Sequence, residues 1–186
     1  TGIVASRYNG TSGWELFVNS SGQVCLVGFN ASGSNFSQVL SYASLPLNKW
    51  VHIAGQLDMS TFTATTTTSY IMVDGLDVAA AVSRGGTNPT ALIQAGNLEI
   101  GAASGGSNPF DGKIAQVAIY SAKVAQATIK ASMNQALSGS ETSLISAYSF
   151  DNSLLDLTSN DNDLTANGGA AATATDSPFA NAVTAG

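Results

Sequence analysis

The chain has 186 residues, a length that suits one all-β domain or one domain with part of another. Only 10% of the residues are charged and the formal net charge is −6, so no cationic surface is available and we expect no nucleic-acid partner. No apolar run approaches the roughly 20 residues that span a bilayer, so we expect no membrane insertion. Low charge with abundant Ser, Thr, Asn and Gly is typical of secreted, cell-surface or virion-surface β proteins.

Short strands separated by turn signals fill the first two thirds of the chain. Residues 14–18 alternate Trp, Leu and Val with Glu and Phe, the pattern of a half-buried strand. Asp74-Gly75 is the dipeptide of a tight hairpin. The predicted strands cover, in chain order, residues 3–5, 14–18, 23–29, 36–42, 49–58, 64–73, 76–82, 98–102, 114–120 and 144–150.

The periodicity changes after Tyr120. Apolar residues recur near helical spacing from Val124 to Leu137, and Ser121 is the expected N-cap, so we predict one short helix over about residues 121–137. Many short strands, turn signals at roughly ten-residue spacing and a single late helix predict an all-β fold, a sandwich or jelly roll.

Several of these segments resemble laminin G-like domains, in the family's order. The sequence LNKWVHIAGQLD at 47–58 resembles a characteristic strand, and YIMVDG at 70–75 resembles the hairpin that follows it. LEIG at 98–101 and FDGKIAQVAIY at 110–120 resemble the next and the last strand. The resemblance implies an antiparallel two-sheet jelly-roll sandwich of the concanavalin A-like lectin/glucanase superfamily, closed by one short helix.

The order of the two ends is unusual for this family. We predict a laminin G-like jelly roll at 1–137, lacking its usual first strands, and at 138–186 a strand plus acidic loop that resembles the start of the same domain type. Either the chain carries the end of one repeat and the start of the next, or the domain is permuted and 144–150 lies beside 114–120. Both alternatives leave a strand edge short of a partner, which predicts self-association or pairing with repeats of the same domain.

The acidic loop is a candidate calcium site, because carboxylate and amide oxygens on a flexible loop are ligands that calcium prefers. The resemblance strengthens this, since related jelly rolls often hold a structural calcium near this loop. The alternative is a solvated turn in which Asp and Asn serve as turn formers. The predicted calcium ligands are Asp151, Asp156, Asn160, Asp161 and Asp163.

Carbohydrate recognition needs aromatic faces for the sugar rings and polar loop groups for the hydroxyls. Tyr8 lies in a Gly/Asn turn and is the better surface candidate, whereas Trp14 begins an alternating strand and is also explained as a core residue. The predicted glycan-binding residues are Tyr8, Asn9, Trp14, Asn35, Asn88 and Asn108.

Catalysis has little support in the sequence. The superfamily's glucanases place two acids on one strand, whereas Glu15 and Glu99 each stand alone on theirs and His52 is the single histidine. We therefore predict a non-enzymatic surface module for adhesion or carbohydrate recognition, stabilised by calcium. The alternative is a structural self-assembling subunit of a virion decoration, fibre or filament, with strand-mediated contacts and no glycan ligand.

Overall fold

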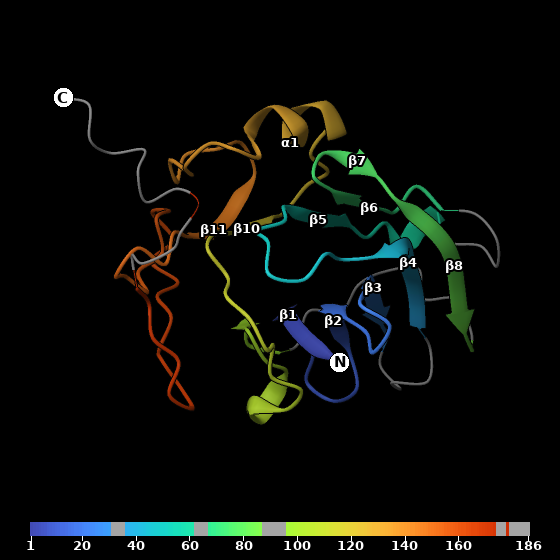
Figure 1. Ribbon diagram of the computed structural model, residues 1–186, viewed down its shortest axis with the longest axis horizontal. Helices are drawn as coiled ribbons and strands as arrows, with labels where there is room; N and C mark the ends of the chain where they lie inside the picture. Colours follow the sequence, from blue (N-terminus) through green and yellow to red (C-terminus); the bar gives the residue numbers. More distant parts are fainter. Residues whose placement is uncertain (31–35, 62–66, 87–95, 174–177, 179–186) are drawn as a thin grey trace. The chain divides into compact units, whose positions relative to one another are not determined.

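The computed structural model describes residues 1–30, 36–61, 67–86, 96–173 and 178 (Figure 1). The chain forms two compact units, Thr1–Gly112 and Lys113–Gly186. The sequence predicts a division after residue 137, because the two parts resemble different regions of the family's domain. That division stays a prediction. Among the described residues, no helix has the length and apolar character needed to cross a membrane.

A six-stranded antiparallel sheet dominates unit 1. Its strand order is β8-β4-β3-β2-β1-β9. Its strands are β1 (Gly2–Ser6), β2 (Gly13–Val18), β3 (Gln23–Phe29), β4 (Phe36–Ser44), β8 (Ala79–Gly85) and β9 (Glu99–Ile100). β2 and β3, which match the strands predicted over 14–18 and 23–29, are joined by a tight turn in which the Gly22 N–H donates to the Asn19 carbonyl at 2.9 Å.

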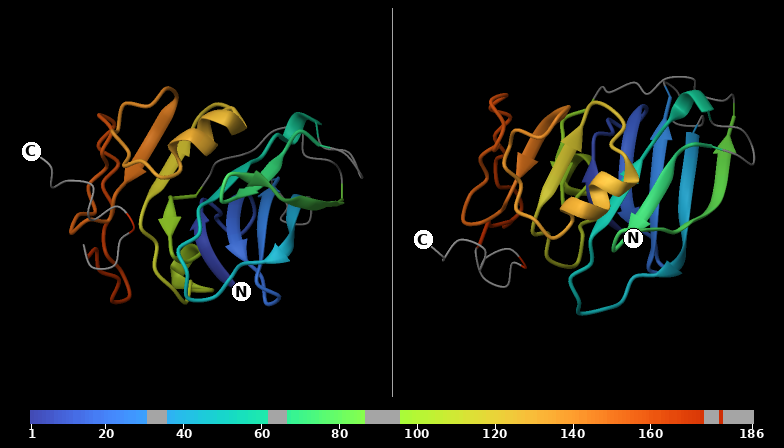
Figure 2. Two further views of the ribbon diagram at one scale, coloured as in Figure 1. Left: turned by 45° about the horizontal axis from the view of Figure 1, so that its top comes forward. Right: turned by 90° about the horizontal axis from the view of Figure 1, so that it is seen from above.

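A three-stranded sheet forms the second layer of unit 1 (Figures 1 and 2). It contains β5 (Ile53–Gln56), β6 (Tyr70–Val73) and β7 (Leu76–Asp77), in that order. Asp74 and Gly75 join β6 to β7 with φ angles of 48° and 75°, the left-handed pair of a type I′ turn. Two short 3-10 turns, η1 (Met59–Thr61) and η2 (Ser104–Gly106), complete the described elements of unit 1.

The core of unit 1 lies between these two sheets. Val24 and Val39 of the larger sheet and Ile71 of the smaller one are fully buried together with Leu26, and Leu16 and Val82 pack against them. Burying an aliphatic side chain of this size stabilises a fold by roughly 1.5–3 kcal/mol. The all-β, antiparallel two-sheet sandwich that the sequence predicted is confirmed.

Several predicted strands of unit 1 differ from the observed ones. β6 begins at Tyr70, within the strand predicted over 64–73, and β9 is shorter than the strand predicted over 98–102. The strand predicted over 49–58 begins only at Ile53, because its partner β6 ends at Val73 and turns away, leaving residues 49–52 no strand to pair with. The strand predicted over 76–82 is split. β7 pairs with β6, whereas β8 pairs with β4, so the chain changes sheets at Val78.

Unit 2 contains a two-stranded antiparallel ribbon and one helix. In the ribbon, β10 (Val117–Tyr120) pairs with β11 (Leu144–Tyr148) of the same chain. The helix α1 spans Gln126–Ser132 and is shorter than the predicted 121–137. Ser121 is not its N-cap, because the Ser121 hydroxyl donates instead to the Ser143 carbonyl at 3.1 Å and fastens the end of the ribbon.

Candidate functional site

The face of the six-stranded sheet that points away from β5, β6 and β7 is the outer face. Leu16, Leu26 and Val39 point into the core, so the residues that alternate with them lie on the outer face. No described strand of unit 1 lies over it (Figure 1). Its register positions include Ser6, Glu15, Phe17, Val27, Phe29, Phe36, Gln38, Leu40, Ser83, Gly85 and Glu99.

Three aromatic rings form a row across one end of the outer face. The Tyr8 ring lies 4.5 Å from the Phe29 ring, between centroids, with the planes inclined by 34°. The Phe29 ring lies 6.5 Å from the Phe36 ring, inclined by 53°. We call these residues the aromatic row. Tyr8 follows β1, Phe29 ends β3 and Phe36 begins β4, so the row spans the middle of the sheet end.

Glycines at two sheet positions leave room for this row. Gly13 pairs with Phe29 and has φ of 123°, and a Cβ there would lie 2.9 Å from the Tyr8 Cα and 1.9 Å from the Arg7 carbonyl oxygen. Gly85 pairs with Phe36, and its Cβ would lie 2.4 Å from that ring. With no side chain at either position, the Phe36 ring lies against Gly85 of β8 and the backbone of Arg7 and Tyr8 passes close to Gly13.

Hydrogen bonds on both sides fix the segment that carries Tyr8. The Asn9 side-chain oxygen accepts the Thr11 N–H at 3.0 Å and the Ser12 N–H at 2.9 Å, an Asx turn. On the other side, the Arg7 Nε donates to the Gly96 carbonyl at 2.9 Å. The backbone on either side of Tyr8 is therefore restrained by these hydrogen bonds.

Two carboxylates lie on the outer face beside the aromatic row. In the sheet register, Ser6 of β1 is opposite Glu15 of β2 on one side and Glu99 of β9 on the other. Burial raises the pKa of Glu15, and a hydrogen bond with the Ser6 side chain only partly opposes this. Burial also raises the pKa of Tyr8, and the nearby Glu15 charge adds to the effect. The sequence showed two isolated acids, and only the cross-strand register shows that they share a face.

The predicted glycan-binding residues do not gather at one place. Tyr8 belongs to the aromatic row, and Asn9 holds the adjoining turn. Trp14 pairs with Gly28 on the side that faces the second sheet, opposite to the outer face. Asn108 is exposed, and its carbonyl accepts the Ile3 N–H at 3.0 Å. Asn35 and Asn88 lie outside the described residues.

Asp156, predicted as a calcium ligand, is the centre of a hydrogen-bond network in unit 2. Its Oδ1 accepts the Ala147 N–H at 2.9 Å and the Thr158 N–H at 3.0 Å. Its Oδ2 accepts the Thr158 hydroxyl at 2.9 Å and the Asn162 N–H at 3.1 Å. Burial of this carboxyl acts to raise its pKa, but these hydrogen bonds outweigh burial and lower it. The carboxylate thereby fastens the acidic loop to β11.

The other predicted calcium ligands surround this network without converging on one point. The Asp163 Oδ1 accepts the Asp156 N–H at 2.9 Å, and the Asn160 Nδ2 donates to the Ile145 carbonyl at 2.8 Å. Asp151 and Asp161 are exposed. Across the described part of the chain, no three His, Cys, Asp or Glu side chains come together in a way that could hold a metal ion. Calcium binding stays a prediction.

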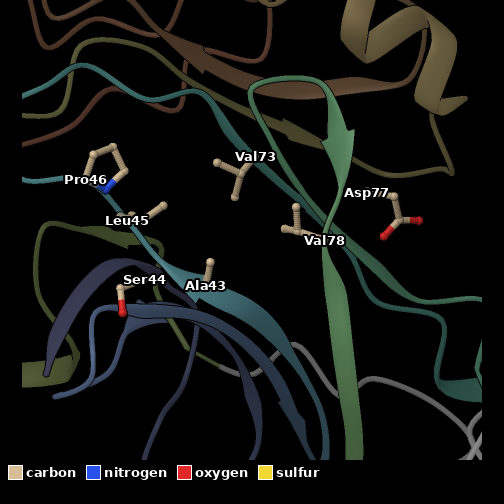
Figure 3. A pocket seen from close by; sticks show the side chains of 7 residues that line it. All are labelled: Ala43, Ser44, Leu45, Pro46, Val73, Asp77 and Val78. Carbon is tan, nitrogen blue, oxygen red and sulfur yellow. The ribbon is translucent and has the colours of Figure 1, made fainter.

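Unit 1 also has a small apolar hollow near the end of β4 (Figure 3). It has a volume of about 180 Å³ and includes Leu45, Pro46, Val73 and Val78 in its lining. Asp77 is the only charged residue of the lining, and its carboxylate accepts the Ala79 N–H at 3.1 Å. Small-molecule sites are usually larger, roughly 300–1,000 Å³, and have converging polar groups, so the outer face is the better candidate site.

Comparison with protein families agrees with the antiparallel sandwich. The family model described as the concanavalin A-like lectin/glucanases superfamily matches residues 1–130, well over half of the chain. Neither the search of curated proteins nor the search of solved structures gave a match. Members of this lectin-like superfamily are typically non-catalytic modules of a carbohydrate-binding or adhesion type. The resemblance found in the sequence is confirmed, and the chain belongs to the concanavalin A-like lectin/glucanases superfamily as a laminin G-like jelly roll.

Proposed function

We propose that this chain is a carbohydrate-recognition module that binds saccharides on the outer face of its six-stranded sheet. The observation that carries the proposal is the aromatic row of Tyr8, Phe29 and Phe36, three half-buried rings at one end of the outer face, near the Glu15 carboxylate. Aromatic rings contact the apolar faces of sugar rings, and carboxylate oxygens accept hydrogen bonds from sugar hydroxyls.

The arrangement favours binding over hydrolysis. Glu15 and Glu99 lie on strands separated by β1, two strand spacings or about 9.6 Å apart at the backbone. The superfamily's glucanases instead place two acids on one strand. We therefore propose a role in adhesion or recognition at a secreted, cell-surface or virion-surface location, in line with the low charge of the sequence. If calcium stabilises the module, Asp151, Asp161 and Asp163 are the carboxylates available to it, because that of Asp156 already accepts four hydrogen bonds.

A glycan array followed by calorimetry of the best ligand tests the proposal. We expect Tyr8→Ala to weaken binding about tenfold or more, because it removes the ring at the open end of the row. Tyr8→Phe keeps the ring and should retain most of the affinity. Trp50→Ala is the matched control, because Trp50 is 40% exposed but precedes β5, outside the sheet that carries the row. Absence of any glycan ligand, or equal binding by Tyr8→Ala and the wild type, would refute the proposal.

A structural self-assembling subunit is the second candidate function, and the β8 edge supports it. β8 has seven residues, contains no proline, and in the described chain is the last strand on its side of the sheet. Long edge strands are templates for pairing with another chain. Sedimentation over a wide concentration range would detect such assembly. Assembly without any glycan binding would favour this candidate over the first.

A further inference from the structure

The charges on the outer face indicate which kind of saccharide it would bind. This inference rests on the proposed function. Glu15 and Glu99 are the carboxylates among the described register positions of that face, and no Lys or Arg shares those positions. Arg7, the nearest basic residue along the chain, donates its Nε to the Gly96 carbonyl. At these described positions an anionic saccharide would therefore meet two carboxylates and no basic side chain to balance them.

Both carboxylates have unused capacity to accept hydrogen bonds. Among the described residues, Ser6 is the side-chain hydrogen-bond partner of Glu15, although an ionised carboxylate has about four acceptor positions. In the described chain, Glu99 has no hydrogen bond or ion pair through its side chain, and it is half-buried. A donor carried by a ligand would fill these positions without displacing a protein group.

The aromatic row lies close enough to Glu15 to contact a protonated amine that binds to this carboxylate. Glu15 is a diagonal neighbour of Phe29 on the outer face, because its own partner Val27 is two residues away from Phe29. Tyr8, whose ring packs against that of Phe29, is close enough for the Glu15 charge to affect its pKa. Aromatic faces attract ammonium groups, and a carboxylate beside them adds a charge-assisted hydrogen bond.

From this juxtaposition we infer that the outer face binds amine-bearing saccharides, with Glu15 and the aromatic row taking one protonated amine and Glu99 another. The two carboxylates are too far apart for one amine to bridge, since β1 lies between their strands. A saccharide with an amine on successive rings supplies donors to both. Polymers of glucosamine have this chemistry.

Calorimetry with glucosamine oligosaccharides and their N-acetylated equivalents of the same length tests the inference on the full chain. We expect the amine form to bind about tenfold more tightly, and the difference to shrink as salt is added. Glu15→Gln and Glu99→Gln should each weaken amine binding about fivefold and leave binding of the acetylated form unchanged. Asp111→Asn is the matched control, because it removes one exposed carboxylate of unit 1 outside the strands.

The outcomes separate this inference from the proposed function. If the acetylated form binds as tightly as the amine form, the preference is wrong and carbohydrate recognition stands. If neither form binds and a glycan array is also empty, the proposed function fails with it. If a lysine peptide of equal charge binds as well as the glucosamine oligosaccharide, or Asp111→Asn weakens binding as much as Glu15→Gln, the attraction is nonspecific and the inference is overturned.

Discussion

Replacing Asp156 with Ala should destabilise unit 2 far more than any other single acid-to-neutral change in its acidic loop. The substitution removes the acceptor for three backbone N–H groups, those of Ala147, Thr158 and Asn162. Ala147 is fully buried, so its N–H cannot turn to water unless the ribbon opens. A buried donor left without a partner costs roughly 1–3 kcal/mol.

The expected loss is about 3–4 kcal/mol for Asp156→Ala, because not all three donors are as deeply buried as the first. Asp156→Asn keeps one oxygen but turns an amide N–H₂ toward groups that donate, and should cost about 1–2 kcal/mol. Asp161→Asn is the control. It removes the same charge from an exposed position whose φ of 52° suits Asn, and should change stability by less than about 0.5 kcal/mol.

Amide hydrogen exchange of β10 and β11 is the assay, because it reports on unit 2 separately from unit 1. Both tryptophans, Trp14 and Trp50, lie in unit 1, so their fluorescence during urea unfolding serves as an internal reference. We expect Asp156→Ala to lose protection across the ribbon while the tryptophan transition stays in place. Protection equal to that of Asp161→Asn would refute the structural role given to this carboxylate.

Four further outcomes follow from the same geometry. Gly13→Ala should lower the urea midpoint of the tryptophan transition by the equivalent of more than about 2 kcal/mol, because the added Cβ would clash with backbone atoms. Gly10→Ala is the control. Gly10 has φ of 95° and no atom within 4 Å of an added Cβ, so the substitution should cost only about 1 kcal/mol of backbone strain. Glu15→Gln should raise that midpoint at neutral pH and leave it unchanged in acid, because a raised carboxyl pKa means that the folded state disfavours the charged form above it. The hydrogen bonds to Asp156 lower its pKa below 3.8. The amide-exchange protection of β11 in the wild type should therefore persist above pH 3.8 and be lost as the pH falls through the lowered pKa. Asp156→Asn should remove this pH dependence. EDTA should leave the protection of β11 unchanged, because Asp156 is satisfied by protein donors, and a loss of protection would instead support a calcium ion at this loop.

The parts of the fold that local chemistry determines could be predicted from the sequence. The β2–β3 hairpin and the Asp74-Gly75 turn both depend on residues within a few positions of each other, and both are confirmed. Strand ends depend on distant partners. Nothing near Lys49 in the chain reveals that β6 stops at Val73, and the split at Val78 depends on which sheet each neighbour joins. Both strands were therefore predicted too long.

The outer face could be predicted only in part for the same reason. Tyr8 is identifiable as a surface aromatic from its turn, but the row also needs Phe29 and Phe36, which look like ordinary strand residues. The position of Ser6 depends on a bulge in β1 between Ile3 and Ala5, which shifts the register so that Ile3 and Ser6 both face outward. Strict alternation would place them on opposite faces, and a one-residue error of this kind removes Ser6 from between Glu15 and Glu99.

Asp156 and Glu15 show how a carboxylate that supports the fold differs from one with a proposed role in binding. Asp156 is filled by protein donors and its pKa is lowered, so the fold gains from its charge. Glu15 has one hydroxyl partner and its pKa is raised, so the fold loses from its charge and an apolar or amide side chain would suit the sheet better. A residue that breaks a local rule without a structural gain is expected at a functional site. The two substitutions should then separate cleanly: Asp156→Asn should weaken unit 2 and leave saccharide affinity unchanged, and Glu15→Gln should stabilise unit 1 and weaken the affinity. Loss of stability in Glu15→Gln with unchanged binding would show that the carboxylate supports the sheet and has no part in recognition.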